Sequence, residues 1–250
     1  MPDKRALSTR SIALTVCFTA LYAIFGFMPI SPIIGLPGRA ITAAAITAPL
    51  IGVLLGPYLG MLSTLLGGAI GFFLGVFSPP SFLSGIVTSA VAGALYEGRQ
   101  GTCAFTYFSL LFFFAFYPFV GPVWLYPPLL WFQLIGLLVL ASPLQSFAVR
   151  NMWKPRTSIR LSLAFFTTSL TSTLAGQIAG SLVFEILAWP VFIADVNVWR
   201  LNWQLIAWIY PVERIIIAAA AATIGVALFR VLKSARLSPW LNPRSEQDND

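Results

Sequence analysis

The sequence predicts an all-α protein, a polytopic membrane helix bundle, from its composition and from the length of its apolar segments. Hydrophobic residues make up 58% of the 250 residues and charged residues only 9%, whereas soluble proteins carry about 25% charged residues. The apolar segments run for about 17 to 25 residues, which is the length that a helix needs to cross a hydrocarbon core. We therefore expect a chain that crosses the lipid bilayer several times.

Glycine- and proline-rich turns divide the sequence into eight predicted helices, and thus about eight spans. These helices cover residues 11–30, 40–56, 58–77, 82–97, 104–121, 129–149, 161–189 and 205–232. The first is longer than the apolar core of a signal peptide, which spans about 7–15 residues, so we expect it to be retained. Together the helices predict one transmembrane domain over residues 11–232, between a short N-terminus (1–10) and a polar tail (233–250).

Basic residues gather on one side of the predicted spans, as the positive-inside rule describes. Twelve of the 15 lysines and arginines fall on the side that also holds both ends of the chain. They are Lys4, Arg5, Arg10, Arg99, Arg150, Lys154, Arg156, Arg160, Arg230, Lys233, Arg236 and Arg244. Arg39, Arg200 and Arg214 fall on the opposite side. The distribution predicts a multi-pass protein of the cell membrane with both termini in the cytoplasm, and it gives no indication of a nucleic-acid partner.

The residue types needed for several common enzyme mechanisms are missing from the sequence. The chain contains no histidine, so HExxH metalloproteolysis and Ser-His chemistry are excluded. It has neither a Walker A sequence nor a G-x-S-x-G elbow. Its two cysteines, Cys17 and Cys103, lie in different apolar segments and indicate no disulfide. We therefore expect a protein that is not an enzyme and that needs no cofactor or metal.

Small residues recur at helical spacing in several predicted spans, a pattern that favours close helix packing in a membrane. Gly67, Gly71 and Gly75 form such a row in the third predicted helix. In the first helix, Ala13 and Cys17 form a small face among bulky residues. This face either packs inside the bundle or docks another membrane subunit.

A polar ridge runs along the seventh predicted helix, in the sequence TSTLAGQIAGSLVFEIL. Thr173, Gln177, Ser181 and Glu185 follow one another at intervals of four residues, so they share one side of the helix. An ionisable group at membrane depth costs about 2.5–3.5 kcal/mol to insert and seldom faces lipid. The ridge therefore either forms hydrogen bonds between helices or lines a polar cavity that opens on the outer face.

The segment that joins the last two predicted helices combines aromatic and polar residues. It reads WPVFIADVNVWRLNW. Its tryptophans are typical of an aromatic belt at the membrane surface. Asp195 and Arg200, placed among these rings, are also typical of a lid over a binding pocket.

The last predicted helix opens with WIYPVERIII, which sets an acid beside a base. Adjacent residues on a helix point about 100° apart, so we expect Glu213 and Arg214 to face different neighbours, with Glu185 as the partner of Arg214. Pro211 is expected early in this helix, and in its first turn, where its missing N–H matters least, if the helix begins near residue 209 or 210. The two charges either hold the last two helices together as a buried ion pair or contact a ligand.

The first part of the chain resembles the S components of energy-coupling factor (ECF) vitamin transporters. The resemblance lies in RSIALTVCFTALYAIFGFMPISPIIGLPGRAITAAAITAPLIGVLLGPYLGMLSTLLGGAIGFFLG and in PPSFLSGIVTSAVAGALYEGR, and it covers about residues 10–99. The resemblance depends on four features: an alanine-rich first helix, an outer loop with proline and glycine, a PLIGxLLGPxxG-type turn and a glycine-rich third helix. The last two predicted helices resemble those of the family more loosely.

This resemblance implies a six-helix core that binds a vitamin or related micronutrient near the outer surface. It implies docking through the first helix onto a transmembrane T subunit driven by ATPase subunits. Ala13 matches the first position of the AxxxA motif of the family, and Cys17 replaces the second alanine. The eight predicted helices exceed the six of the family, so residues 104–149 would form an inserted helical hairpin.

The resemblance by region and the polar ridge together give a set of candidate substrate-binding residues. They are Arg39, Gln177, Ser181, Glu185, Asp195, Arg200, Tyr210, Glu213 and Arg214. The function that we expect is substrate capture for an ECF-type ABC importer. The alternative is a proton-coupled secondary transporter of a small molecule, in which Glu185 and Glu213 relay protons. Internal repeats, which are usual in such transporters, are not evident in the sequence.

Overall fold

Helices make up 80% of the described residues in the structure, a computed structural model that covers residues 9–153, 157–235, 237 and 240–241. The helices are α1 (Thr9–Gly26), α2 (Ala44–Leu55), α3 (Pro57–Phe73), α4 (Pro79–Tyr96), α5 (Gln100–Ala115), α6 (Pro122–Leu125), α7 (Trp131–Ala141), α8 (Pro143–Trp153), α9 (Ser158–Ala188) and α10 (Val196–Ser234). A 3₁₀ turn, Pro127–Leu130, precedes α7. One hairpin of β1 (Pro29–Pro32) and β2 (Ala40–Thr42) completes the fold. Lys4, Arg5, Lys154, Arg156, Arg236 and Arg244 lie outside the described residues.

Three helices, α1, α9 and α10, are long and apolar enough to cross a membrane. The bent pair that ends in α8 raises this number to four if it forms one span, and α2, α3 and α5 are shorter apolar helices. The prediction of an all-α protein with membrane-spanning helices is therefore confirmed at this level.

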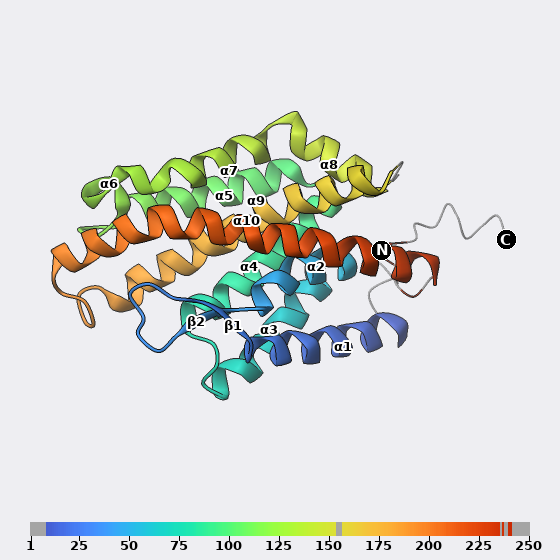
Figure 1. Cartoon of the computed structure of the whole chain (residues 1–250), viewed down its shortest axis with the longest axis horizontal. Coiled ribbons are helices and arrows are strands. Elements are labelled where there is room, and N and C mark those ends of the chain that lie inside the picture. The colour runs from blue at the N-terminus through green and yellow to red at the C-terminus, as the bar shows by residue number, and fades with distance from the viewer. Residues whose placement is uncertain (1–8, 154–156, 236, 238–239, 242–250) are drawn as a thin grey trace.

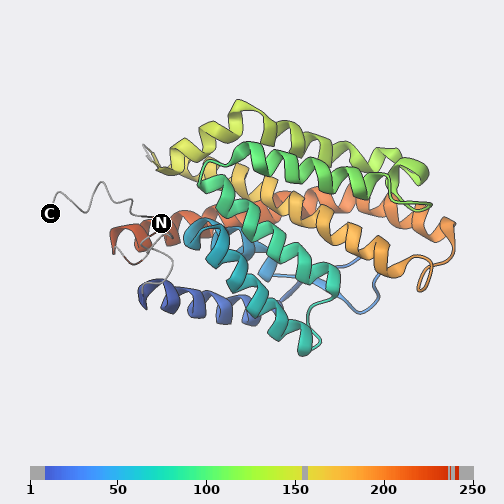
Figure 2. The same ribbon diagram turned by 180° about the vertical axis from the view of Figure 1, so that it is seen from behind.

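The helices form a bundle in which α4 and α9 pack extensively against each other at the centre (Figure 1). On one side of this pair lie α1, α2 and α3, and on the other side lie α5, α7 and α8, as the reverse view shows (Figure 2). α10 packs along both α9 and α2. The start of α1 and the end of α10 lie at the same end of the bundle (Figure 1).

Glycines allow the central helices to approach closely, as the small-residue rows predict. A Cβ atom added to Gly52 of α2 would lie 2.1 Å from the carbonyl oxygen of Ser89 in α4. A Cβ added to Gly176 of α9 would lie 2.0 Å from Oγ1 of Thr88 in α4. Gly75 behaves differently from the prediction, because α3 ends at Phe73 and Gly75 lies in the following turn at a φ of 74°.

The predicted helix over 129–149 is broken at Ser142, where α7 and α8 meet at a bend of 60°. Pro143 lacks an N–H and disfavours a helical conformation at the residue before it, and Ser142 accordingly has an extended ψ of 164°. The Nε2 of Gln100 in α5 donates to the carbonyl oxygens of Leu140 and Ser142 at 2.6 and 2.9 Å. The break is thus closed by a side chain from a neighbouring helix.

The last helix begins at Val196 rather than near residue 205 as predicted. Asp195 caps it, because the Asn197 N–H donates to its Oδ1 at 2.8 Å. Pro211 consequently lies inside α10 instead of in its first turn, which corrects the prediction. A proline frees the carbonyl four residues earlier, and the Nε1 of Trp131 donates to that carbonyl, of Ala207, at 3.1 Å.

Candidate functional site

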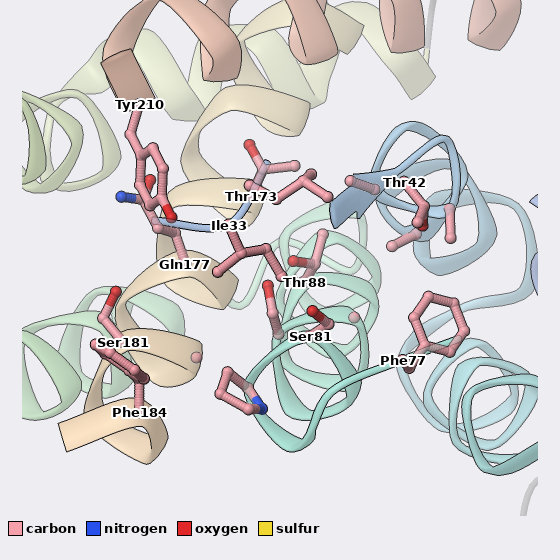
Figure 3. A pocket seen from close by; sticks show the side chains of 18 of the residues that line it. Ile33, Thr42, Phe77, Ser81, Thr88, Thr173, Gln177, Ser181, Phe184 and Tyr210 are labelled. Carbon is pink, nitrogen blue, oxygen red and sulfur yellow. The ribbon is translucent and has the colours of Figure 1, made fainter. Parts of the chain in front are cut away.

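A partly open cavity of about 90 Å³ lies between the β-hairpin, α2, α4, the second half of α9 and the first half of α10 (Figure 3). Its polar wall is made mainly of hydroxyl groups, one amide and one cation. These residues are Tyr22, Thr42, Ser81, Ser84, Thr88, Thr173, Gln177, Ser181, Tyr210 and Arg214. Its apolar wall includes Ile33, Phe77, Phe184 and Trp203. A mainly apolar wall with a few convergent polar groups is typical of a small-molecule site.

Three members of the predicted ridge on α9, Thr173, Gln177 and Ser181, line this cavity. Figure 3 shows Gln177, Ser181 and Phe184 following one another along α9, with Tyr210 of α10 beside Gln177. The Oε1 of Gln177 has no hydrogen-bond partner among the residues that the structure describes. The structure therefore brings Gln177 and Ser181 together with Tyr210 and Arg214, as a binding site requires.

Glu185, the fourth member of the ridge, does not line the cavity. Its side chain is completely buried, and neither carboxylate oxygen has a hydrogen-bond partner within the described part of the chain. The predicted pairing of Glu185 with Arg214 is therefore wrong in this structure.

Glu213 and Arg214 contact each other, contrary to the prediction that they face different neighbours. Nη2 of Arg214 lies 3.4 Å from Oε1 of Glu213. The other carboxylate oxygen, Oε2, accepts a hydrogen bond from the Ser31 hydroxyl of β1 at 3.2 Å. The backbone positions diverge by about 100°, but these side chains are long enough to meet beside the helix. Arg214 lines the cavity and Glu213 does not.

Arg39, Asp195 and Arg200 lie outside the cavity lining. Arg39 is exposed and donates to the carbonyl oxygen of Gly75. Asp195 serves as the N-cap of α10, and Arg200 is exposed in its first turns. Because α10 begins earlier than predicted, Arg200 is ten residues, or about 15 Å, from Tyr210 along the helix. The predicted lid over the cavity is replaced by the β-hairpin and the first turns of α10.

The predicted docking face of α1 points away from the bundle. Ala13 and Cys17 are exposed, whereas Thr15 and Thr19 are buried on another face of the helix. The hydroxyl of Thr19 contacts that of Ser63 in α3 at 3.2 Å. Internal packing, one of the two alternatives for Ala13 and Cys17, is therefore not observed.

The cavity also contains residues of α4 that are not among those predicted. Ser81, Ser84 and Thr88 line it from α4. They are spaced by three and four residues, so they share one face of a helix that is otherwise largely apolar. This polar row is the signal in the sequence that could have identified them, just as the ridge of α9 identified Gln177.

No protein family, curated protein or solved structure matches the chain. Within the residues that the structure describes, no group of three or more acidic or cysteine side chains could hold a metal ion. The case for a function therefore depends on the cavity, on the buried charges near it and on the exposed face of α1.

Proposed function

We propose that this protein is a membrane-embedded substrate-binding subunit of an ECF-type importer. It captures a vitamin or related micronutrient from outside the cell and delivers it with a transmembrane T subunit and ATPase subunits. The chain belongs in the cell membrane as a multi-pass protein with about eight spans and with both termini in the cytoplasm.

The observation that supports this proposal most directly is the position of the cavity. Its helical wall comes from the end of α1, the first parts of α2 and α4, the second half of α9 and the first half of α10. These parts lie away from the start of α1 and the end of α10, which share one end of the bundle (Figure 1) and which the positive-inside rule assigns to the cytoplasm. The cavity wall combines Gln177 and Ser181 from the second half of α9 with Tyr210 and Arg214 from the first half of α10. A polar cavity at this depth is suited to taking a small molecule from outside.

The arrangement of the helices fits a six-helix core with an inserted hairpin. α1, α2, α4, α9 and α10 supply all of the helical lining residues of the cavity, and α3 packs against α1, α2 and α4. α5, α7 and α8 pack against α9 from the opposite side. In the proposal they are the inserted hairpin over 104–149, which crosses the membrane outside the substrate-binding core.

The docking of partner subunits is assigned to the exposed face of α1. Ala13 and Cys17 lie on this face, where their small side chains allow another helix to approach closely. The cavity and this face are separate features, because neither residue lines the cavity. A change to the face should therefore affect assembly without affecting ligand binding.

The experiment that tests the proposal measures assembly and binding separately. The tagged protein should co-purify with a T subunit and ATPases from its own cells, and alone in nanodiscs it should bind a micronutrient without nucleotide. Ala13→Trp should abolish co-purification and leave binding intact, whereas Phe105→Trp, an exposed position on α5, should change neither. Failure of ligand binding in Ala13→Trp would show that the face packs internally and would overturn its assignment.

A second function, proton-coupled secondary transport, is favoured by one observation. The buried carboxylate of Glu185 has no hydrogen-bond partner in the described residues, and buried acids of this kind relay protons in membrane transporters. Uptake into liposomes by the protein alone, driven by a pH gradient and lost in Glu185→Gln, would support this alternative. It would exclude the importer subunit, which needs its partners for transport.

A further inference from the structure

We propose, on the basis of the proposed function, that the cavity binds a one-ring molecule through a carboxylate group held by Arg214 and by the N-terminus of α2. Three features of the described residues lead to this assignment. The cavity wall carries a buried cation with unused hydrogen-bond donors, it carries no acid, and an uncapped helix begins at its floor.

The guanidinium of Arg214 has donors available for a ligand. The residue is only 5% exposed, yet it lines the cavity. Its Nε has no hydrogen-bond partner among the described residues, and its contact with Glu213 at 3.4 Å involves Nη2 alone. A guanidinium has five N–H donors in a planar fork that matches a carboxylate. Arg214 therefore keeps a donor for a ligand carboxylate in addition to its contact with Glu213.

The acid that balances Arg214 lies outside the cavity. Glu213 is turned toward Ser31, whose hydroxyl it accepts at 3.2 Å, and it is not a lining residue. Among the described residues that line the cavity, Arg214 is the one charged side chain. A ligand entering the cavity therefore meets a positive charge without a competing carboxylate on the wall.

The N-terminus of α2 adds a second positive feature. Thr42, Ala44 and Ala45 line the cavity, and Ala43 at the N-cap provides no side-chain hydrogen bond. The first N–H groups of a helix lack partners within the helix and carry about half a positive charge, so they attract anions. α4 also begins at the cavity, but Ser78 caps it and prolines occupy its first positions.

Arg214 and the start of α2 line the same cavity, and they are offset only a little along the bundle. α2 and α10 run in the same direction (Figure 1), and a Cβ added to Gly225 would lie 2.7 Å from Leu50. If residues are counted back from this contact along each helix, at 1.5 Å per residue, Arg214 lies about 7 Å farther along the bundle than Ala44 does. An arginine side chain spans a distance of this size, so a carboxylate between them can contact both.

The remaining wall limits the rest of the ligand. The cavity of about 90 Å³ is of the same order as the roughly 150 Å³ cavity that admits benzene, so it suits one ring rather than several. Phe77, Phe184 and Ile33 offer apolar surface to the faces of a ring. The unpartnered Oε1 of Gln177 accepts a hydrogen bond from an N–H or O–H group on that ring.

The test uses three probes that share a pyridine ring and carry an anionic, a neutral or a cationic substituent at the same position, namely nicotinate, nicotinamide and 3-(aminomethyl)pyridine. Binding to the full chain in nanodiscs is measured from the fluorescence of its tryptophans, which include Trp203 in the cavity wall. Nicotinate should bind about tenfold more tightly than nicotinamide, because its bonds to Arg214 are charge-assisted. The cationic amine should bind most weakly.

Variants separate the role of Arg214 from a loss of folding. Arg214→Gln should bring the affinities for nicotinate and nicotinamide to within about twofold, and Arg214→Lys should keep a reduced preference for the acid. The double variant Glu213→Gln with Arg214→Gln leaves no unpaired charge and should behave like Arg214→Gln. Glu213→Gln alone should tighten nicotinate binding, because Arg214 then loses the ion-pair partner that balances its charge. Arg160→Gln, an exposed position at the far end of α9, is the matched control.

The outcomes distinguish this assignment from the proposed function. Equal or tighter binding of nicotinamide or of the amine to the unaltered protein would overturn the carboxylate assignment, and so would a preference for nicotinate that survives in the double variant. No binding of any probe would show that a one-ring carboxylate is the wrong class. None of these results affects co-purification with a T subunit and ATPases, which tests the proposed function independently.

Discussion

Three ionisable side chains, Glu185, Glu213 and Arg214, are buried in α9 and α10. Glu213 and Arg214 balance each other at 3.4 Å, and Ser31 adds a hydrogen bond to Glu213. Glu185 has no such partner among the described residues. A buried polar group without a hydrogen bond destabilises a protein, whereas a paired group is close to neutral. The two acids should therefore respond differently to substitution.

Replacing the unpartnered acid should stabilise the protein. Glu185→Leu should raise the free energy of unfolding by about 1–3 kcal/mol, because the buried polar group is removed. Glu185→Gln should raise the free energy of unfolding by a smaller amount, since an amide of the same size is also left without partners. Unfolding of the purified protein in detergent measures both variants. A loss of stability in Glu185→Leu would mean that the carboxylate makes a stabilising contact in the purified protein.

Part of the candidate site could be predicted from single residues. Gln177 and Ser181 follow from a spacing of four residues on an apolar helix, because helical geometry fixes which side they share. The contact between Glu213 and Arg214 could not be predicted in this way, since it depends on side-chain rotamers rather than on backbone direction. The position of Arg39 depends on how the outer loop folds onto the turn that contains Gly75, which no local pattern encodes.

At the level of the helices, two interruptions of a helical backbone are matched by a donor from another element. Gln100 donates to the carbonyls at the break between α7 and α8, and Trp131 donates to the carbonyl of Ala207 that Pro211 leaves free. Backbone groups without partners are costly in lipid, so such side chains make proline tolerable within a bundle.

The contact between Trp131 and Ala207 predicts coupling between Trp131 and Pro211. Trp131→Phe should lower the free energy of unfolding by about 1–3 kcal/mol, because the carbonyl of Ala207 loses its donor. In a Pro211→Ala background the restored N–H bonds that carbonyl within the helix, so Trp131→Phe should have a smaller effect. A double-mutant cycle of unfolding free energies measures the coupling. Equal effects in both backgrounds would show that the indole does not replace the missing backbone donor.

The close contact between α2 and α4 predicts a position where one methyl group is not tolerated. Gly52→Ala places a Cβ 2.1 Å from the carbonyl oxygen of Ser89, so the helices must separate, at a cost of about 1–3 kcal/mol. Gly101→Ala in α5 meets no atom within 4 Å and should be neutral or slightly stabilising. Thermal unfolding of both variants measures the difference in stability. An unchanged unfolding temperature in Gly52→Ala would contradict the packing of α2 on α4.

The eight predicted segments each contain a helix in the structure, but the break at Ser142 and the early start of α10 differ from the prediction for physical reasons. Apolar length and glycine–proline turns are local properties, and they locate a segment well. The break at Ser142 depends on whether Gln100 is near enough to bond the freed carbonyls, which is a tertiary property. α10 starts early because Asp195 caps it. The sequence does not show this start clearly, because the polar residues among 196–204 also indicate a loop.

For the whole molecule, the unequal lengths of the helices create the cavity. α2 has 12 residues and reaches only about 18 Å, less than a hydrocarbon core of about 30 Å. The β-hairpin fills part of the space above it, with Ile33 N donating to Arg39 O and Ala43 N to Met28 O, both at 2.9 Å. Non-helical backbone is tolerated at such a depth where protein surrounds it or where it lines a cavity. The space that the hairpin leaves unfilled is the cavity.

The same geometry makes the membrane topology testable, because the ends of α9 should lie on opposite sides of the bilayer. α9 has 31 residues and is about 46 Å long, which exceeds the hydrocarbon thickness. In a chain made free of cysteine by Cys17→Ala and Cys103→Ala, Val191→Cys should react with an impermeant maleimide in intact cells. Ser158→Cys should react only after the membrane is opened, because the positive-inside rule places the start of α9 in the cytoplasm. Labelling of both positions in intact cells would mean that α9 does not cross the bilayer, and the reverse pattern would place both the cavity and the proposed substrate on the cytoplasmic side.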